Sequence, residues 1–147
     1  MLEHQTTYRV IYGDTDKMGI AYYGNYLRWF EIGRTEMIRS WGLSYKSIEE
    51  KGVLLPVSEA YCKFLASAQY DDILVIKTVL DTSVKAGIKF NYEVCNQADK
   101  RLLTTGYTKH AFMDTQGKVI RPPGFFRELI KNNIQQNSQS PTRGQSL

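Results

Sequence analysis

The stretch DTDKMGIAYYGNY, residues 14–26, joins a strand pattern to a helix pattern and carries two carboxylates followed by a glycine. Before it, β-forming residues alternate from Thr7 to Tyr12, as in a short strand. After it, from Gly24 to Trp41, apolar residues recur at spacings of three and four, which predicts one long amphipathic helix. The unpaired N–H groups of a helix N-terminus can polarise a carbonyl oxygen, while a nearby carboxylate attacks the carbon or activates water. The stretch therefore indicates acyl-transfer chemistry without a serine, a cysteine or a metal.

The apolar face of the predicted helix includes a glycine, Gly33. Glycine in a helix interior costs about 1 kcal/mol of helix propensity relative to alanine. Close approach of the helix to a flat surface, such as a sheet, would offset that cost. Gly42 follows the last apolar position and suits the residue just after a helix end. Glu31 and Arg34 are three residues apart on the helix flank, a spacing that predicts a weak ion pair.

The remainder of the chain is predicted to be mainly β structure. Strand-like segments occupy residues 57–64, 73–80, 88–95 and 102–113, and turn-forming residues separate them. Short links between successive strands indicate an antiparallel meander. The expected fold is α+β, in the order β-α-β-β-β-β, with one long helix on one face of an antiparallel sheet. Strands this apolar leave further surface to bury, which favours packing against a second copy.

The last part of the chain leaves the β pattern at Pro122-Pro123-Gly124. Residues 125–134 favour a short helix, whereas residues 135–147 (QQNSQSPTRGQSL) are polar and low in complexity. We therefore expect a single domain over residues 1–134 and a mobile tail over residues 135–147.

The composition is that of an ordinary domain, with 147 residues of which 42% are hydrophobic. No run of about 18 apolar residues exists, and Met1–Gln5 does not resemble a signal peptide, so a cytoplasmic protein without a transmembrane segment is expected. Cys62 and Cys95 fall in strand-like segments and are expected to be free, half-buried thiols. His4 and His110 are too few and too far apart to predict a histidine metal site.

The formal net charge is +4, and the pI is about 9.0. Basic character can indicate nucleic-acid binding, but the lysines and arginines are scattered rather than clustered. A small anionic ligand that carries phosphates fits such a mild excess equally well.

The opening motif, with Asn25-Tyr26, Phe30-Glu31 and Arg34 after it, resembles the 4-hydroxybenzoyl-CoA thioesterase group of hotdog-fold proteins. It is also similar to the acyl-CoA thioesterases encoded with the bacterial Tol–Pal system. The resemblance covers roughly residues 7–123. Less specific agreement follows at residues 68–72 (AQYDD), residues 106–111 (GYTKHA) and Arg121-Pro122.

This resemblance implies a hotdog fold, in which a curved antiparallel sheet wraps one long helix. It implies a homodimer whose two sheets join, often a dimer of dimers (homotetramer), with the active site at the subunit interface. The implied reaction is hydrolysis of an acyl-CoA thioester to a carboxylic acid and free coenzyme A, with no metal or organic cofactor. By position, the family's catalytic aspartate corresponds to Asp16, as base or nucleophile, and its carbonyl-polarising backbone N–H to Tyr23. Many Tol–Pal-type members carry histidine at the position of Tyr23, a departure that leaves a backbone role intact.

Most candidate residues near the motif also have a structural interpretation. Asp16 suits catalysis but also an Asx-turn, whereas Asp14 is expected to hold the loop by accepting backbone N–H bonds. Gly19, the candidate substrate-binding glycine, suits a positive φ or the close approach of a ligand. Tyr26 is expected in the core, and His110 is expected to be structural.

The candidates for contact with the phosphates of coenzyme A are Lys85, Lys89 and Arg121. Taken singly, each fits a solvated charge better. Three rival functions stay open at this point. A hydratase or dehydratase of acyl thioesters is disfavoured because no histidine lies near Asp16 in sequence. A catalytically silent acyl-CoA-binding hotdog module and a nucleic-acid binder are the others, the last supported only by the basic pI.

Overall fold

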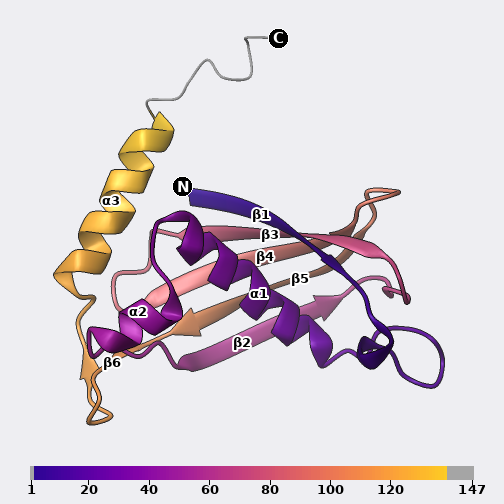
Figure 1. Ribbon diagram of the computed structural model, residues 1–147, viewed down its shortest axis with the longest axis horizontal. Helices are drawn as coiled ribbons and strands as arrows, with labels where there is room; N and C mark the ends of the chain where they lie inside the picture. Colours follow the sequence, from indigo (N-terminus) through magenta and orange to yellow (C-terminus); the bar gives the residue numbers. More distant parts are fainter. Residues whose placement is uncertain (1, 139–147) are drawn as a thin grey trace.

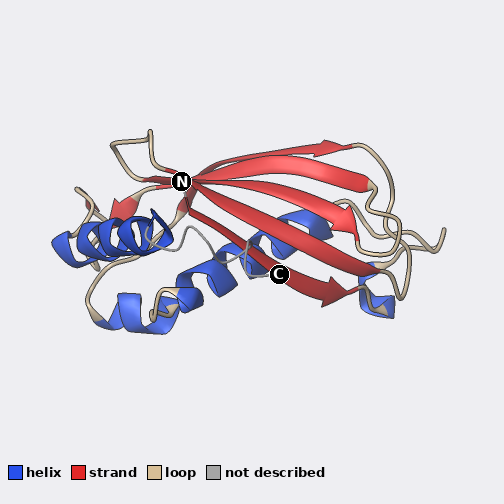
Figure 2. Ribbon diagram, turned by 90° about the horizontal axis from the view of Figure 1, so that it is seen from above, coloured by secondary structure: helices blue, strands red, loops and turns tan. Residues whose placement is uncertain are grey.

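The structure, a computed structural model, describes residues 2–138 and consists of one antiparallel sheet with a long helix across it (Figure 1). The strands are β1 (Leu2–Arg9), β2 (Val57–Phe64), β3 (Ile73–Asp81), β4 (Ile88–Asn96) and β5 (Leu102–His110). The helices are α1 (Asn25–Ser40), α2 (Tyr45–Glu50) and α3 (Gly124–Ser138), with a 3₁₀ turn η1 at Tyr12–Asp14. A two-stranded ribbon pairs β6 (Phe112–Met113) with β7 (Val119–Ile120). Figure 2 shows α1 on one side of the sheet, which confirms the predicted α+β fold.

Helix α1 packs on the sheet through the glycine that the sequence singled out. A Cβ atom on Gly33 would lie 2.5 Å from Thr78 Oγ1 and 2.7 Å from Ile76 Cγ2, both on β3. The predicted close approach of helix to sheet is therefore confirmed. Gly42, with a φ of 87°, directly follows the C-cap residue Trp41, as expected. The apolar residues that α1 buries are Tyr26, Trp29, Phe30, Met37 and Ile38.

The strand order in the sheet is β1-β3-β4-β5-β2, so the predicted meander is right only for β3, β4 and β5. The two edge strands are β2, which pairs with β5, and β1, which pairs with β3. The chain crosses from one edge to the far side of the sheet between Phe64 and Ile73. Local sequence pattern does not encode this crossing, because it depends on which distant strands pair.

The first and the last of the predicted strands differ most from the structure. β1 spans Leu2–Arg9, not Thr7–Tyr12, because its whole length pairs with β3, from Leu2 opposite Leu80 to Arg9 opposite Ile73. The predicted strand over residues 102–113 is interrupted at Ala111, whose N–H donates to Pro56 O at 3.2 Å. The residues beyond Ala111 pair with β7 instead of β2.

Two helical segments also differ. Helix α2 was not predicted, although Ser44 caps it by accepting the Ser47 N–H at 3.0 Å. The predicted helix over residues 125–134 extends to Ser138, so residues 135–138 of the predicted tail are helical. Residues 139–147 of that tail lie outside the described residues. Within residues 2–138, no helix is both long and apolar enough to cross a membrane.

Candidate active site

Asp14 is the structural anchor of the loop between β1 and α1. Its side chain is only 1% exposed. The Tyr8 hydroxyl donates to its Oδ2 at 2.7 Å, the Ile11 N–H donates to the same atom at 3.0 Å, and Arg28 forms an ion pair with Oδ1. The Asp14 backbone O accepts hydrogen bonds from the Tyr22 N–H and from the Asn25 side chain. Asp14 therefore holds the loop to the helix start, as the sequence predicted.

Asp16 lies two residues further on, and its side chain is exposed. Its Oδ1 accepts the Met18 N–H at 2.8 Å, which is an Asx-turn. The turn is closed by the Gly19 N–H on Asp16 O at 3.0 Å, with Gly19 at a φ of 78°. Among the described residues, Oδ2 of Asp16 accepts no hydrogen bond. Asp16 thus both shapes its turn and presents a free carboxylate oxygen, so the two interpretations are compatible.

The N-terminus of α1 offers unpaired donors on the same loop. The Asn25 N–H donates to Tyr22 O, and the Tyr26 N–H donates to Tyr23 O. No side chain caps the helix at Gly24. Over residues 2–138, the N–H groups of Tyr23 and Gly24 donate no hydrogen bond. The donor predicted at Tyr23 is therefore available to a ligand, at the positive end of the α1 dipole.

Aromatic side chains surround this helix start. Tyr26 is 3% exposed, and its hydroxyl accepts the Ala68 N–H at 3.2 Å, so it belongs to the core as expected. Tyr23 is 63% exposed and meets Phe64 edge-on, with ring centroids 6.1 Å apart. Tyr22 and Phe64 are about half exposed. The loop with Asp16 therefore borders an apolar surface formed by α1 and the end of β2.

The three predicted phosphate-binding residues do not all meet. Lys85 and Arg121 line one cavity of about 740 Å³ between the β3–β4 hairpin and the β6–β7 ribbon. Lys89 does not line this cavity, and its Nζ lies 3.9 Å from an oxygen of Asp81 and 4.5 Å from the centroid of the Tyr107 ring. The fold thus brings Lys85 and Arg121 together, whereas Lys89 interacts with Asp81 and with the Tyr107 ring.

The Asp16 loop and the Lys85 cavity lie at opposite ends of the sheet (Figure 1). The loop adjoins the start of β3, since the Ile20 backbone bridges to Gln69, whereas Lys85 follows the end of β3. β3 has nine residues, which correspond to about 30 Å at the usual rise of a strand. One subunit alone therefore holds the two groups too far apart for them to contact the same small ligand.

The ion pair predicted between Glu31 and Arg34 is not formed. Arg34 is 8% exposed, and its Nε donates to the Tyr45 hydroxyl at 3.1 Å. The two residues line a small cavity of about 260 Å³ between α1 and β2. The prediction was wrong because Arg34 donates its hydrogen bond to the Tyr45 hydroxyl, which belongs to the unpredicted helix α2.

His110 is buried inside the fold, as expected. Its Nε2 is 2.8 Å from Thr108 Oγ1, and its Nδ1 is 3.1 Å from Leu55 O. Burial lowers the pKa of His110 to about 4, so the imidazole is neutral at pH 7. His110 ends β5, at the end of the sheet away from Asp16. Of the described residues, Cys62 and Cys95 are free and partly buried, also as expected.

Comparisons with known proteins show which proteins this chain resembles in sequence and fold. Residues 10–130 match the thioesterase-like superfamily. The acyl-CoA thioesterase YbgC of Haemophilus influenzae is 30% identical over 122 residues, which cover 82% of this chain and 87% of YbgC. The protein YneP of Bacillus subtilis is 36% identical over 89 residues, 60% of this chain and 64% of YneP. The solved structure of DHNA-CoA thioesterase from Staphylococcus aureus superposes with a TM-score of 0.84, at 29% identity and with 95% of each chain covered.

The chain therefore belongs to the thioesterase-like superfamily. This confirms the resemblance to hotdog-fold thioesterases, and the relatives named acyl-CoA thioesterases support a hydrolase enzyme.

Proposed function

We propose that this protein hydrolyses acyl-CoA thioesters, with Asp16 and the backbone N–H of Tyr23 as the catalytic groups. The proposal rests on one observation, which is that a single loop holds both groups without hydrogen-bond partners among residues 2–138. Asp16 has an unpaired carboxylate oxygen, and the start of α1 has unpaired N–H donors. The relatives named acyl-CoA thioesterases support the choice of substrate class. Both ring nitrogens of the buried His110 are paired inside the fold, with Thr108 and Leu55, which disfavours a hydratase because that reaction would need a histidine free to act beside Asp16.

The chemistry needs few groups, because a thioester carbonyl is electrophilic and a thiolate leaves readily. The Tyr23 N–H polarises the carbonyl oxygen and stabilises the oxyanion that forms on it. Asp16 takes a proton from water as the water oxygen attacks the carbonyl carbon. Collapse of the tetrahedral intermediate breaks the C–S bond, and Asp16 returns the proton that it took from water to the departing thiolate of coenzyme A. In the alternative route, Asp16 attacks the carbonyl carbon itself, the C–S bond breaks with departure of the coenzyme A thiolate, and water hydrolyses the resulting mixed anhydride.

Edge strand β2 provides a way to complete the site with a second subunit. Within residues 2–138, β2 pairs with β5 alone, and Val57, Tyr61 and Phe64 are about half exposed on it. Antiparallel pairing of β2 with the same strand of a second copy would cover this edge and join the sheets. That two-fold pairing places the Phe64 end of one strand beside the Val57 end of the other. The loop with Asp16 would then face the cavity with Lys85 from the partner.

The catalytic proposal is tested with Asp16→Asn, which keeps the side-chain shape and removes the base or nucleophile. Turnover of an acyl-CoA should fall by roughly 10²–10⁴, with little change in substrate binding. Near-native turnover by a folded Asp16→Asn variant would overturn the mechanism. Acyl-CoA binding without turnover by the unaltered protein would support the rival interpretation, a silent binding module. Rates across short, long and aromatic acyl groups would define the acyl specificity.

The shared site is tested by mixing two impaired variants, Asp16→Asn and the double variant Lys85→Gln with Arg121→Gln. If the aspartate and the cations come from different subunits, each mixed dimer contains one native site. After subunit exchange, activity at low substrate concentration should rise to about a quarter of the native value. No rise, with exchange shown by a tag on one variant, would contradict the shared site. Sedimentation of a stable 16.9 kDa monomer at micromolar concentration would do so as well.

A further inference from the structure

Asn25, the first residue of α1, joins the helix to the loop that carries Asp16. Its side-chain Nδ2 donates to the backbone O of Asp14 at 2.7 Å, and its own N–H donates to Tyr22 O at 2.9 Å. The Tyr22 N–H donates to the same Asp14 O at 2.8 Å. Three hydrogen bonds therefore connect Asp14, Tyr22 and Asn25, and two of them meet at one carbonyl oxygen.

Asp16 belongs to a short hairpin, residues 14–22, which we call the Asp16 hairpin. The Tyr22 N–H on Asp14 O closes its base, and Thr15 and Ala21 form the next bridge. The Asp16 N–H donates to Ile20 O at 2.9 Å, beside the turn at the tip. These backbone bonds fix the position of Asp16 relative to the base of the hairpin.

The unpaired donors of the helix start lie on the other side of that base. Tyr23 and Gly24 stand between Tyr22 and Asn25 in the chain, so both ends of their turn are tied to Asp14 O. Because each peptide unit is planar, fixing both ends of so short a turn also fixes the direction of the Tyr23 N–H. One carbonyl oxygen is thus the common reference point for the Asp16 carboxylate and the Tyr23 donor.

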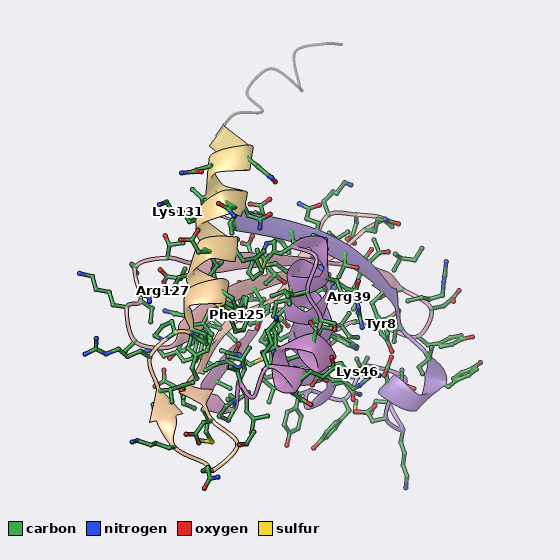
Figure 3. The ribbon with its side chains drawn as sticks, turned by 60° about the vertical axis from the view of Figure 1, so that its left-hand side comes forward. Tyr8, Arg39, Lys46, Phe125, Arg127 and Lys131 are labelled. Carbon is green, nitrogen blue, oxygen red and sulfur yellow. The ribbon has the colours of Figure 1, made fainter. Side chains whose placement is uncertain are left out.

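Other contacts hold the Asp14 side chain rather than its carbonyl group. Figure 3 shows Tyr8 near the end of β1, from which its hydroxyl donates to Asp14 Oδ2 at 2.7 Å. Arg28 of α1 pairs with Oδ1, but its side chain is long and 43% exposed. The shorter Asn25 side chain makes the direct link between the backbone of the hairpin base and the start of α1.

We propose that Asn25 is a positioning residue for hydrolysis, which sets the distance and direction between the Asp16 carboxylate and the Tyr23 N–H. The inference rests on the proposed function, in which these two groups act on one thioester carbonyl. Without the Asn25 amide, Asp14 O still accepts the Tyr22 N–H, so no acceptor is left unpaired. The helix start can then shift against the Asp16 hairpin, and a misplacement of about 1 Å is enough to slow turnover roughly 10²-fold.

The kinetic test uses Asn25→Ala, which removes the amide donor and places a stronger helix former in α1. We expect kcat for an acyl-CoA to fall roughly 10- to 100-fold, with less than about a twofold change in KM, because Asn25 does not bind the substrate. Asn133→Ala is the matched control, since Asn133 Nδ2 donates to Leu129 O at 2.8 Å within α3. The control should keep native turnover. Native kcat in Asn25→Ala, or an equal loss in both variants, would overturn the proposal.

A double variant separates positioning from a general loss of structure. If Asn25 acts by placing Asp16 opposite the Tyr23 N–H, Asn25→Ala should slow an Asp16→Asn protein far less than it slows the native protein. Losses that multiply would show that Asn25 acts independently of Asp16, which would contradict the proposal. Melting temperatures of the single variants should stay close to the native value, and a kcat loss that follows a large drop in melting temperature would also contradict it.

Amide hydrogen exchange tests the link without any turnover. In Asn25→Ala, exchange of the Tyr22 N–H should accelerate roughly tenfold, because the base of the Asp16 hairpin opens more often. The Ala21 N–H donates to Ala68 O at 2.8 Å instead, and its exchange should not change. Equal Tyr22 exchange in the two proteins would overturn the inference.

Together, the two readouts distinguish failure of this inference from failure of the proposed function. If the native protein hydrolysed no acyl-CoA, the proposed function would fail, and the catalytic part of the inference would fail with it, whereas faster Tyr22 exchange would still establish the link. If Asn25→Ala exchanged faster but kept native kcat, the positioning role would be wrong and the proposed function would stand.

Discussion

The Tyr8 hydroxyl donates a 2.7 Å hydrogen bond to Oδ2 of Asp14, and this contact separates the roles of two carboxylates only two residues apart. Asp14 is buried and also holds Arg28 and the Ile11 N–H. Asp16 is exposed and keeps one oxygen free of hydrogen bonds from residues 2–138. The first carboxylate fixes the loop, so the second can be available for chemistry.

Asp14→Asn should therefore destabilise the fold. The amide cannot accept from Tyr8, Ile11 and Arg28 as the carboxylate does, and hydrogen bonds to a charged group contribute about 1.5–3 kcal/mol. We expect a loss of about 2 kcal/mol in the free energy of unfolding, measured by urea denaturation. Asp16→Asn is the matched control and should change stability by less than about 0.5 kcal/mol. Equal losses in the two variants would contradict this division of roles.

Gly33→Ala should be destabilising even though alanine favours a helix by about 1 kcal/mol. The new methyl would lie 2.5 Å from Thr78 Oγ1 and 2.7 Å from Ile76 Cγ2, so α1 must move off the sheet. Overpacking of this kind costs about 1–3 kcal/mol, and we expect a lower melting temperature. Gly124→Ala is the control, because nothing lies within 4 Å of a Cβ at the start of α3. A more stable Gly33→Ala protein would show that the close approach is not real.

Stability should fall in mild acid because of His110. Its pKa is lowered from 6.5 to about 4 in the folded protein, so the unfolded chain binds more protons between these values. The free energy of unfolding is therefore fully retained above about pH 6.5 and decreases as the pH falls toward 4. The shift corresponds to about 3 kcal/mol in total. His110→Gln should flatten the slope between pH 4.5 and 6.5 in urea titrations, whereas an unchanged slope would contradict the assignment.

The helix and the loop could be predicted from the sequence because their signals are local. Gly33 on the apolar face of the helix correctly predicted close packing of the helix against the sheet. Gly42 correctly predicted where the helix ends. Asp14 could be recognised as an anchor because its backbone partner, Ile11, is three residues away. The partner Arg28 is 14 residues away, and no local pattern connects the two.

What the sequence did not predict depends on long-range packing. The position of β2 at the sheet edge follows from its pairing with β5, and the place of Lys89 follows from contacts with Asp81 and Tyr107. Arg127 was unremarkable in a short helical pattern. It lines the same cavity as Lys85 because α3 packs beside the β3–β4 hairpin.

Tyr23 allows the backbone and the side chain to be tested separately. If the N–H polarises the thioester carbonyl, Tyr23→Phe should retain most activity, since it keeps the ring and the donor. Tyr23→Pro removes the donor, and the ring of proline is tolerated at the beginning of a helix. Its turnover should fall by about 10²–10³, the usual cost of losing an oxyanion-hole donor.

The outcome is informative only if the proline variant folds, which circular dichroism and sedimentation would establish. The Tyr23 N–H donates to no described residue, so proline there removes no hydrogen bond of the fold. The Tyr23 side chain is 63% exposed, and its ring packs edge-on against Phe64. If Tyr23→Phe lost as much turnover as a folded Tyr23→Pro, the hydroxyl would be the working group. The helix-terminus mechanism would then be wrong, and the tyrosine would act where many Tol–Pal-type relatives carry histidine.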